Sequence, residues 1–202
     1  MFRPGWIAAL GLAVAVAALA WSHLRQAQRP AGASKLERLA RMPDFDFPAH
    51  DGSRVSAGDL RGRVWVANAV RTDQEETPSA LTARMFELQE ALKRSKAGGV
   101  SLISFTPDRQ PDSPDELAAR AREAGADHTW WKFLKGPETD VARTGLLEPA
   151  AVADGGGPAR PRGFAVVDQS GWVRAFVDGD DPEAIQKLLI TVGEVLREGP
   201  AT

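Results

Sequence analysis

Apolar runs and amphipathic stretches follow one another along most of the chain. Segments 64–70 (VWVANAV) and 100–105 (VSLISF) are apolar runs of the kind that parallel strands buried on both faces carry. Between them, apolar residues at helical spacing predict a helix over about 78–96, with Thr77 as its N-cap and Pro78 in its first turn. The apolar face of this helix consists of Leu81, Met85, Leu88 and Leu92.

The remaining pattern completes an alternation of strands and helices. Alternating Phe45 and Phe47 before the turn at Asp51-Gly52 predict an opening hairpin. A capping box at 113–116 begins a helix that ends near Gly125. A short strand (129–134), a short helix, a closing hairpin (163–168 and 172–179) and a final helix from 181 follow. This order predicts an α/β domain of the thioredoxin-like plan, a mixed central sheet flanked by helices.

The N-terminal region has a different pattern. Residues 5–21 contain seventeen positions without a charge, preceded by Arg3, and Trp6 and Trp21 stand where interfacial aromatic residues would lie. We expect an N-terminal transmembrane helix within 1–22, a basic tether over 23–42 that is helical in part, and a domain over 43–198. A retained anchor is favoured, although Ala18-Leu19-Ala20 has the form of a signal-peptide cleavage site.

The side of the membrane on which the domain lies is left open by the charges. Basic residues are more frequent after the apolar segment than before it, which favours a cytoplasmic domain. Arg3 in front of the segment favours export. We expect a single-pass membrane protein with its domain on the extracytoplasmic side.

Composition excludes several classes of function. The 202 residues include 25 basic and 27 acidic ones, a net charge of −2 that gives no indication of a nucleic-acid partner. The chain contains no cysteine, which excludes disulfides, thiolate nucleophiles and metal–thiolate sites.

Four segments of the chain carry a resemblance to a known family. They are 45–70, Thr77-Pro78 with the helix that follows, 103–117 (ISFTPDRQPDSPDEL) and 163–179. Together they resemble the SCO/SenC family of copper chaperones and thiol oxidoreductases, over roughly residues 43–197. The resemblance implies a thioredoxin-like fold and a role in the assembly of respiratory oxidases or copper sites.

The resemblance also implies where the copper ligands of the family would be. Asp73 and Thr77 occupy the positions of its two cysteines, and Arg160 that of its histidine. Copper(I) prefers thiolate and imidazole donors, and an arginine repels a cation. We therefore expect no copper, no other cofactor and no enzymatic activity, since no catalytic constellation is recognisable.

Two further features allow alternative interpretations. The acidic loop of Asp73, Glu75 and Glu76 could bind a hard cation or a small ligand, or could simply be solvated near a helix N-terminus. Trp130 and Trp131 stand next to each other, so that strand alternation would bury one ring and expose the other as a possible partner surface.

The sequence thus favours one functional hypothesis. It is a membrane-anchored, SCO/SenC-like protein that is non-catalytic and acts through protein contacts in cytochrome c oxidase or copper-site assembly. Its expected partners are membrane lipid, through the anchor, and a protein of that assembly. The alternative is a binding protein that uses the acidic loop 73–76.

Overall fold

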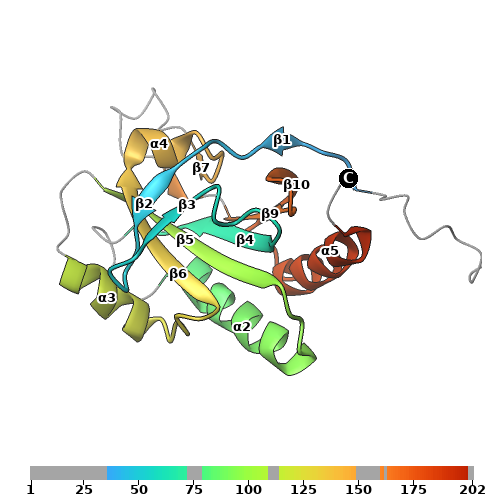
Figure 1. Cartoon of the computed structure of the whole chain (residues 1–202). Helices are drawn as coiled ribbons and strands as arrows, with labels where there is room; N and C mark the ends of the chain where they lie inside the picture. The colour runs from blue at the N-terminus through green and yellow to red at the C-terminus, as the bar shows by residue number, and fades with distance from the viewer. Residues whose placement is uncertain (1–35, 72–78, 109–113, 149–159, 162, 200–202) are drawn as a thin grey trace, which may run out of the picture. The chain divides into compact units, whose positions relative to one another are not determined.

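Three parallel strands form the middle and one edge of the central sheet: β4 (Val64–Ala69), β5 (Val100–Asp108) and β6 (Trp131–Pro137). The hairpin of β9 (Gly163–Val167) and β10 (Trp172–Asp178) joins them, with β9 antiparallel to β4. The short strand β1 (Ala40–Arg41) pairs with β10, which gives the order β1-β10-β9-β4-β5-β6 (Figure 1). All residues of β4 and β9 are buried, as expected for strands covered on both faces. The predicted mixed sheet is confirmed.

The computed structural model describes residues 36–71, 79–108, 114–148, 160–161 and 163–199, which belong to one unit bounded by Ser34 and Thr202. Among these residues, no helix has both the length and the apolar character that crossing a membrane requires. The expected anchor over 1–22 lies outside the described residues, as does most of the expected tether.

Two layers of side chains cover the sheet. One face packs against α2 (Ala80–Ser95), α3 (Pro114–Glu123) and α5 (Ala184–Glu198), whose buried residues form one apolar cluster with Val64, Val66 and Trp131. The other face packs against the opening hairpin of β2 (Asp46–Pro48) and β3 (Arg54–Ser56) and against α4 (Glu138–Ala142). Figure 1 shows α2 and α3 below the sheet, with α4 and the hairpin above it.

The start of α2 differs from the prediction. Its N-cap is Ser79, and the Ser79 hydroxyl accepts a hydrogen bond from the backbone N–H of Thr82 at 3.2 Å. The prediction of Thr77 as the cap is therefore wrong. Serine and threonine are both favoured as N-caps, so residue type alone could not distinguish the two positions.

Residues 36–42 form part of the folded unit, although the sequence assigned them to the tether. Residues 37–39 are irregular rather than helical, and Leu39 donates its N–H to the carbonyl of Val173 at 2.9 Å. Met42 donates to the carbonyl of Gly171 at 3.0 Å, and its side chain is buried. The expected helix is wrong at these residues because the segment pairs with β10 instead.

Candidate functional site at the carboxyl end of the sheet

The position that the resemblance assigns to the copper site follows β4, where the strand leaves the sheet at its carboxyl end. β4 and β5 run in register from Val64 beside Val100 to Ala69 beside Phe105. Asp73, Thr77 and the acidic loop 73–76 lie outside the described residues, between Arg71 and Ser79. The site can therefore be built from the described residues on its margins.

Arg71 forms one margin of the site. Its side chain is only 4% exposed, and its Nη1 atom lies 3.6 Å from Oε1 of Glu138, the first residue of α4. This ion pair joins the end of β4 to the helix that follows β6. The guanidinium carries a permanent positive charge, which the Glu138 carboxylate offsets.

A chain of buried hydrogen bonds crosses the three parallel strands, from the first residue of β6 through the middle of β5 to Asn68 near the end of β4. The indole Nε1 of Trp131 donates to the Ser104 hydroxyl at 2.9 Å, and that hydroxyl donates to Oδ1 of Asn68 at 2.6 Å. All three side chains are fully buried. Nδ2 of Asn68 has no hydrogen-bond partner among the described residues. The bonds fix β4, β5 and β6 relative to one another, because breaking one would leave a buried polar group unpaired.

This polar chain has no catalytic character. The Ser104 hydroxyl donates its proton to an amide oxygen, whereas an activated nucleophile would donate to a base such as histidine. His50, the described histidine nearest to a core strand, accepts at Nδ1 from the N–H of Phe133 at 3.1 Å. Burial lowers the pKa of His50, which favours its neutral form. His50 thus has a structural role at the hairpin.

The described residues also do not fit copper. They contain no group of three histidine, cysteine, aspartate or glutamate side chains that could hold a metal. The two described methionines, the remaining sulfur donors, lie in different core clusters on opposite faces of the sheet, with Met85 on the helical face and Met42 on the hairpin face. A thioether site would need them to converge on one point.

Arg160, which the resemblance assigns to the family's histidine position, belongs to a small separate sheet. Its strand β8 (Arg160–Pro161) pairs antiparallel with β7 (Leu147–Glu148), so that the backbones of Arg160 and Glu148 lie opposite each other. The side chain of Arg160 lies outside what the structure describes. The backbone position is thus known, while the role assigned to the side chain stays a prediction.

The tryptophan pair lies at the start of β6, where Trp130 belongs to the preceding turn and Trp131 is the first residue of the strand, so both contact the same core cluster. Trp131 is fully buried, stacks on Phe133 at 5.0 Å between ring centroids, and cannot form part of a partner surface. Trp130 is half-buried and packs at the edge of the same core cluster. Of the predicted surface, only Trp130 remains a candidate.

Sequence reasoning missed Asn68 and Ser104. Both are polar residues within otherwise apolar strands, and that interruption was the available signal. Their alignment depends on the register of β4 and β5, in which they lie opposite each other.

Three comparisons with known proteins bear on this geometry. A family model described as SCO1/SenC matches residues 33–145. The chain is 36% identical over 92 residues to the SCO1 protein homolog of Bacillus subtilis (strain 168). That alignment covers 46% of this chain and 47% of the relative, so it spans about half the length of each.

Solved structures extend the likeness to the fold. A SCO1/SenC family lipoprotein from Bacillus anthracis str. Ames matches with a TM-score of 0.67 at 23% identity, over 80% of this chain and 98% of that one. BsSco, a member of the Sco family of cytochrome c oxidase assembly proteins, matches with a TM-score of 0.65 at 25% identity, over 79% and 96% of the two chains. The fold is thioredoxin-like, as the order of elements predicts.

Proposed function

The chain belongs to the SCO1/SenC family, and from this premise we propose that it is a membrane-anchored, non-catalytic member acting through protein contacts in the assembly of cytochrome c oxidase or its copper site. The observation that carries the proposal is a family fold combined with a chain that has no cysteine. BsSco belongs to a family of cytochrome c oxidase assembly proteins, which supports this setting.

The chemistry of the chain supports a non-catalytic role. Thiol–disulfide exchange needs a thiolate, and a copper(I) site of this kind needs thiolate or imidazole donors. Read from the resemblance, the three donor positions hold Asp73, Thr77 and Arg160. The fold would still offer its surface for contacts with a protein partner.

Residues 5–21 support the attachment to a membrane. Their apolar length is at the lower limit of what a spanning helix needs, and the basic residues that follow could contact lipid headgroups. We place the domain on the extracytoplasmic side, where the Bacillus anthracis relative, a lipoprotein, provides an analogy. A periplasmic reporter fused to the C-terminus would be active in this orientation, and an inactive reporter would exclude it.

The absence of copper binding is tested by a competition titration. The purified full chain and a variant carrying Asp73→Cys, Thr77→Cys and Arg160→His are titrated with Cu(I) against a chromophoric chelator. We expect no competition from the natural chain and competition from the variant, since the fold around the site is that of the family. A natural chain that removes Cu(I) from the chelator would refute the non-catalytic proposal.

The same purified chain is used to test the alternative function, cation binding by the acidic loop 73–76. Ca²⁺ is added while the thermal unfolding of the chain is followed. A stabilisation of several degrees that is lost on Asp73→Asn with Glu76→Gln would support a hard-cation site in the acidic loop instead.

Partner binding is tested in native membranes. Capture of the tagged full chain after mild crosslinking should recover a subunit or assembly protein of the oxidase, and deletion of the gene should lower the amount of assembled oxidase. Unchanged oxidase levels in the deletion strain would contradict the proposed role.

A further inference from the structure

The end of the sheet opposite the candidate site collects three segments of the chain. Because β9 is antiparallel to β4 and β10 is antiparallel to β9, the amino end of β4 lies beside the turn 169–171. Gly62 donates to the carbonyl of Gln169 at 2.8 Å, and Met42 donates to that of Gly171 at 3.0 Å. Segments 36–42 and 61–63 therefore flank this turn on its two sides.

Exposed arginines are the main feature of these segments. The guanidinium carbons of Arg38 and Arg41 each lie 5.6 Å from the centroid of the Trp172 ring. Arg61 and Arg63 are exposed on the other side of the turn. We call the surface formed by these four arginines and Trp172 the tether face. Stacking on an indole orients two of the cations without neutralising them.

Acidic residues do not cancel this charge. The exposed carboxylates within the same segments or within two residues of them in the chain are Glu37, Asp44 and Asp59, one fewer than the four arginines, and that of Asp59 accepts hydrogen bonds from Ser56. Leu39 is 51% exposed between the two stacked arginines and offers an apolar side chain at the same surface. A cationic surface with an aromatic ring and an exposed aliphatic residue has the composition of a membrane interface.

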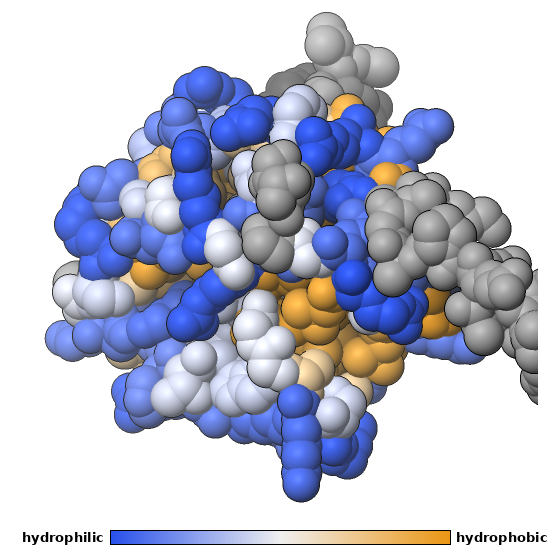
Figure 2. Space-filling view, turned by 45° about the vertical axis from the view of Figure 1, so that its right-hand side comes forward, coloured by the Kyte–Doolittle hydropathy of each residue, from blue (hydrophilic) through white to orange (hydrophobic). Residues whose placement is uncertain are grey.

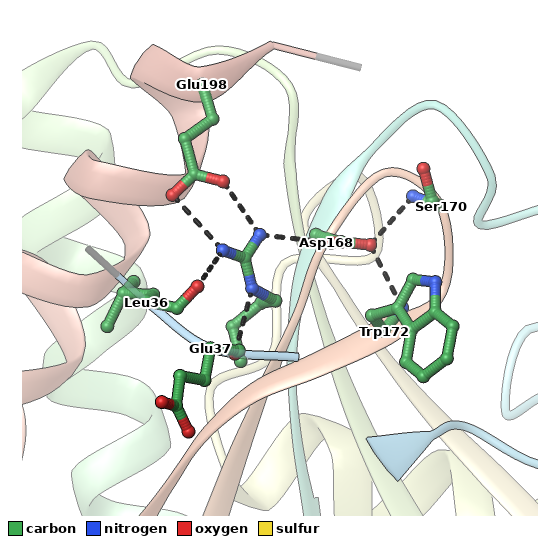
Figure 3. A network of polar contacts seen from close by, with 7 residues as sticks. Leu36, Glu37, Asp168, Ser170, Trp172 and Glu198 are labelled. Carbon is green, nitrogen blue, oxygen red and sulfur yellow. Dashed lines mark hydrogen bonds and ion pairs between the residues drawn. The ribbon is translucent and has the colours of Figure 1, made fainter. Parts of the chain in front are cut away.

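The segment that carries Arg38 and Arg41 is fixed to the domain by a buried network. Arg174 donates from Nε to the carbonyl of Glu37 at 3.2 Å and from Nη2 to that of Leu36 (Figure 3). Its guanidinium also contacts the carboxylates of Asp168 at 3.1 Å and Glu198 at 2.7 Å. Figure 3 shows Glu198 at the C-terminal end of α5 facing Leu36 and Glu37 of the incoming chain. The direction in which the chain reaches the domain is therefore set by the fold.

The opposite end of the sheet has the opposite character. It includes the carboxyl ends of β4 to β6, the end of β10 and the amino ends of α3, α4 and α5. Its described acidic residues outnumber its basic ones, since three cations, Arg71, Arg143 and Lys187, pair with four of the eight carboxylates. The eight are Asp115, Glu116, Glu138, Asp140, Asp178, Asp180, Asp181 and Glu183. The net charge of −2 therefore conceals an uneven distribution along the strands. Figure 2, which turns the side of β10 and α5 forward, shows a mainly hydrophilic surface around one apolar area.

We propose that the tether face binds anionic phospholipid headgroups, so that the domain lies on the membrane with its acidic end directed away from the lipid. This rests on the membrane attachment proposed above. Between the apolar segment 5–21 and Leu36 lie only 14 residues, 22–35, which span at most about 50 Å when fully extended. The tether face carries the charge that an anionic surface attracts, and the acidic end carries the charge that it repels.

The test uses the full chain in vesicles, and the lack of cysteine makes single labels straightforward. Ser170→Cys places a label in the turn of the tether face, and Asp180→Cys places one beyond the other end of β10. The seven residues of β10 separate these sites by roughly 20 Å. Energy transfer from each label to a headgroup acceptor is measured in phosphatidylcholine vesicles with and without phosphatidylglycerol.

We expect phosphatidylglycerol to increase energy transfer strongly from the label of S170C. Energy transfer from the label of D180C should increase only slightly. Arg41→Gln with Arg61→Gln should shift the docking equilibrium by roughly 25-fold, about fivefold for each arginine. Arg143→Gln with Lys187→Gln removes the same charge near the acidic end and should leave docking unchanged. Thermal unfolding of both double variants checks that they fold.

Equal energy transfer from both labels, or a transfer unaffected by Arg41→Gln with Arg61→Gln, would overturn the proposal. An acidic protein surface would then be the better candidate for binding to the tether face. Flotation with neutral vesicles tests the anchor separately. A chain that floats with neutral vesicles but shows no lipid-dependent transfer contradicts only this inference. If the chain floats only with anionic vesicles and Arg41→Gln with Arg61→Gln abolishes this flotation, the result supports lipid binding by the tether face. The same result contradicts the transmembrane anchor.

Discussion

Replacing Arg174 by methionine should be among the most destabilising single changes in the domain. The guanidinium is 5% exposed and serves two carboxylates, those of Asp168 at 6% and Glu198 at 18% exposure. Methionine preserves much of the volume and removes the charge. The Asp168 carboxylate would then keep two backbone donors, from Ser170 and Trp172 at 2.9 Å each, but would lose its counterion in a buried environment.

The size of the expected loss in the free energy of unfolding follows from the burial of this ion pair. Removing one partner of a buried ion pair costs about 3–5 kcal/mol, because the remaining charge is left uncompensated. An exposed pair contributes only about 0–1 kcal/mol. The chain contains a matched control in Arg54, which pairs with Asp46 at 3.1 Å while both side chains are 61% exposed. We therefore expect Arg174→Met to cost several times as much as Arg54→Met.

Urea unfolding of the full chain, followed by tryptophan fluorescence, measures both costs. A third variant, Arg174→Met with Asp168→Asn and Glu198→Gln, removes the uncompensated charges and should recover a substantial part of the loss. If Arg174→Met costs no more than Arg54→Met, the buried network does not stabilise the domain and the reasoning fails.

Trypsin cleavage tests the effect of Arg174→Met on the segment around residues 36–41, in addition to the unfolding of the whole domain. The network holds the carbonyls of Leu36 and Glu37, next to the trypsin sites at Arg38 and Arg41. Trypsin should cleave Arg174→Met in this segment faster than the natural chain under conditions where both are folded. Equal cleavage rates would show that β1 pairing alone keeps the segment in place.

Three further predictions concern the hairpin, helix α2 and the edge of the sheet. Because burial lowers the pKa of His50 below its ordinary 6.5, the unfolded chain binds the proton more readily. The free energy of unfolding should therefore fall as the pH drops below about 6.5, and His50→Gln should flatten that slope; an unchanged slope in urea titrations at several pH values would contradict it. Ser79→Ala removes the N-cap of α2 and should cost about 1 kcal/mol in the same assay, whereas Ser95→Ala at the last residue of the helix should cost less. Gly136→Ala would bring a Cβ to 2.6 Å from the ring of Phe47, so we expect a loss of about 1–3 kcal/mol, and a neutral result would mean that the hairpin moves freely.

The sequence was most informative where structure is local or strongly patterned. The apolar runs of β4 and β5, the closing hairpin and α5 lie where periodicity predicts them. The two-residue strand β1 was missed because its signal is too short and its partner, β10, lies some 130 residues later in the chain. A basic stretch such as 35–41 is equally compatible with a solvated tether and with a segment docked by backbone hydrogen bonds.

The sequence could predict which chemical groups the candidate site lacks, but not how the side chains near it are arranged. Counting cysteines excluded thiol chemistry without any structure. The hydrogen bonds from Trp131 through Ser104 to Asn68 required the register of three strands, which no local pattern specifies. Asp168 and Arg174 are likewise charged residues among apolar neighbours, and only the hairpin register and the end of α5 show that they form one network.

The two ends of the sheet together indicate how a family member without thiols could still act. The scaffold at the carboxyl end is held by Ser79 at the start of α2 and by the buried Asn68–Ser104 bond, neither of which depends on a metal or a disulfide. If the donor positions are those that the resemblance assigns, their replacement would remove the chemistry without removing either of these contacts. If the tether face rests on lipid, that end points away from the membrane, where a partner would meet it. Selection on such a protein would act on the acidic end and on the tether face, and much less on the three donor positions.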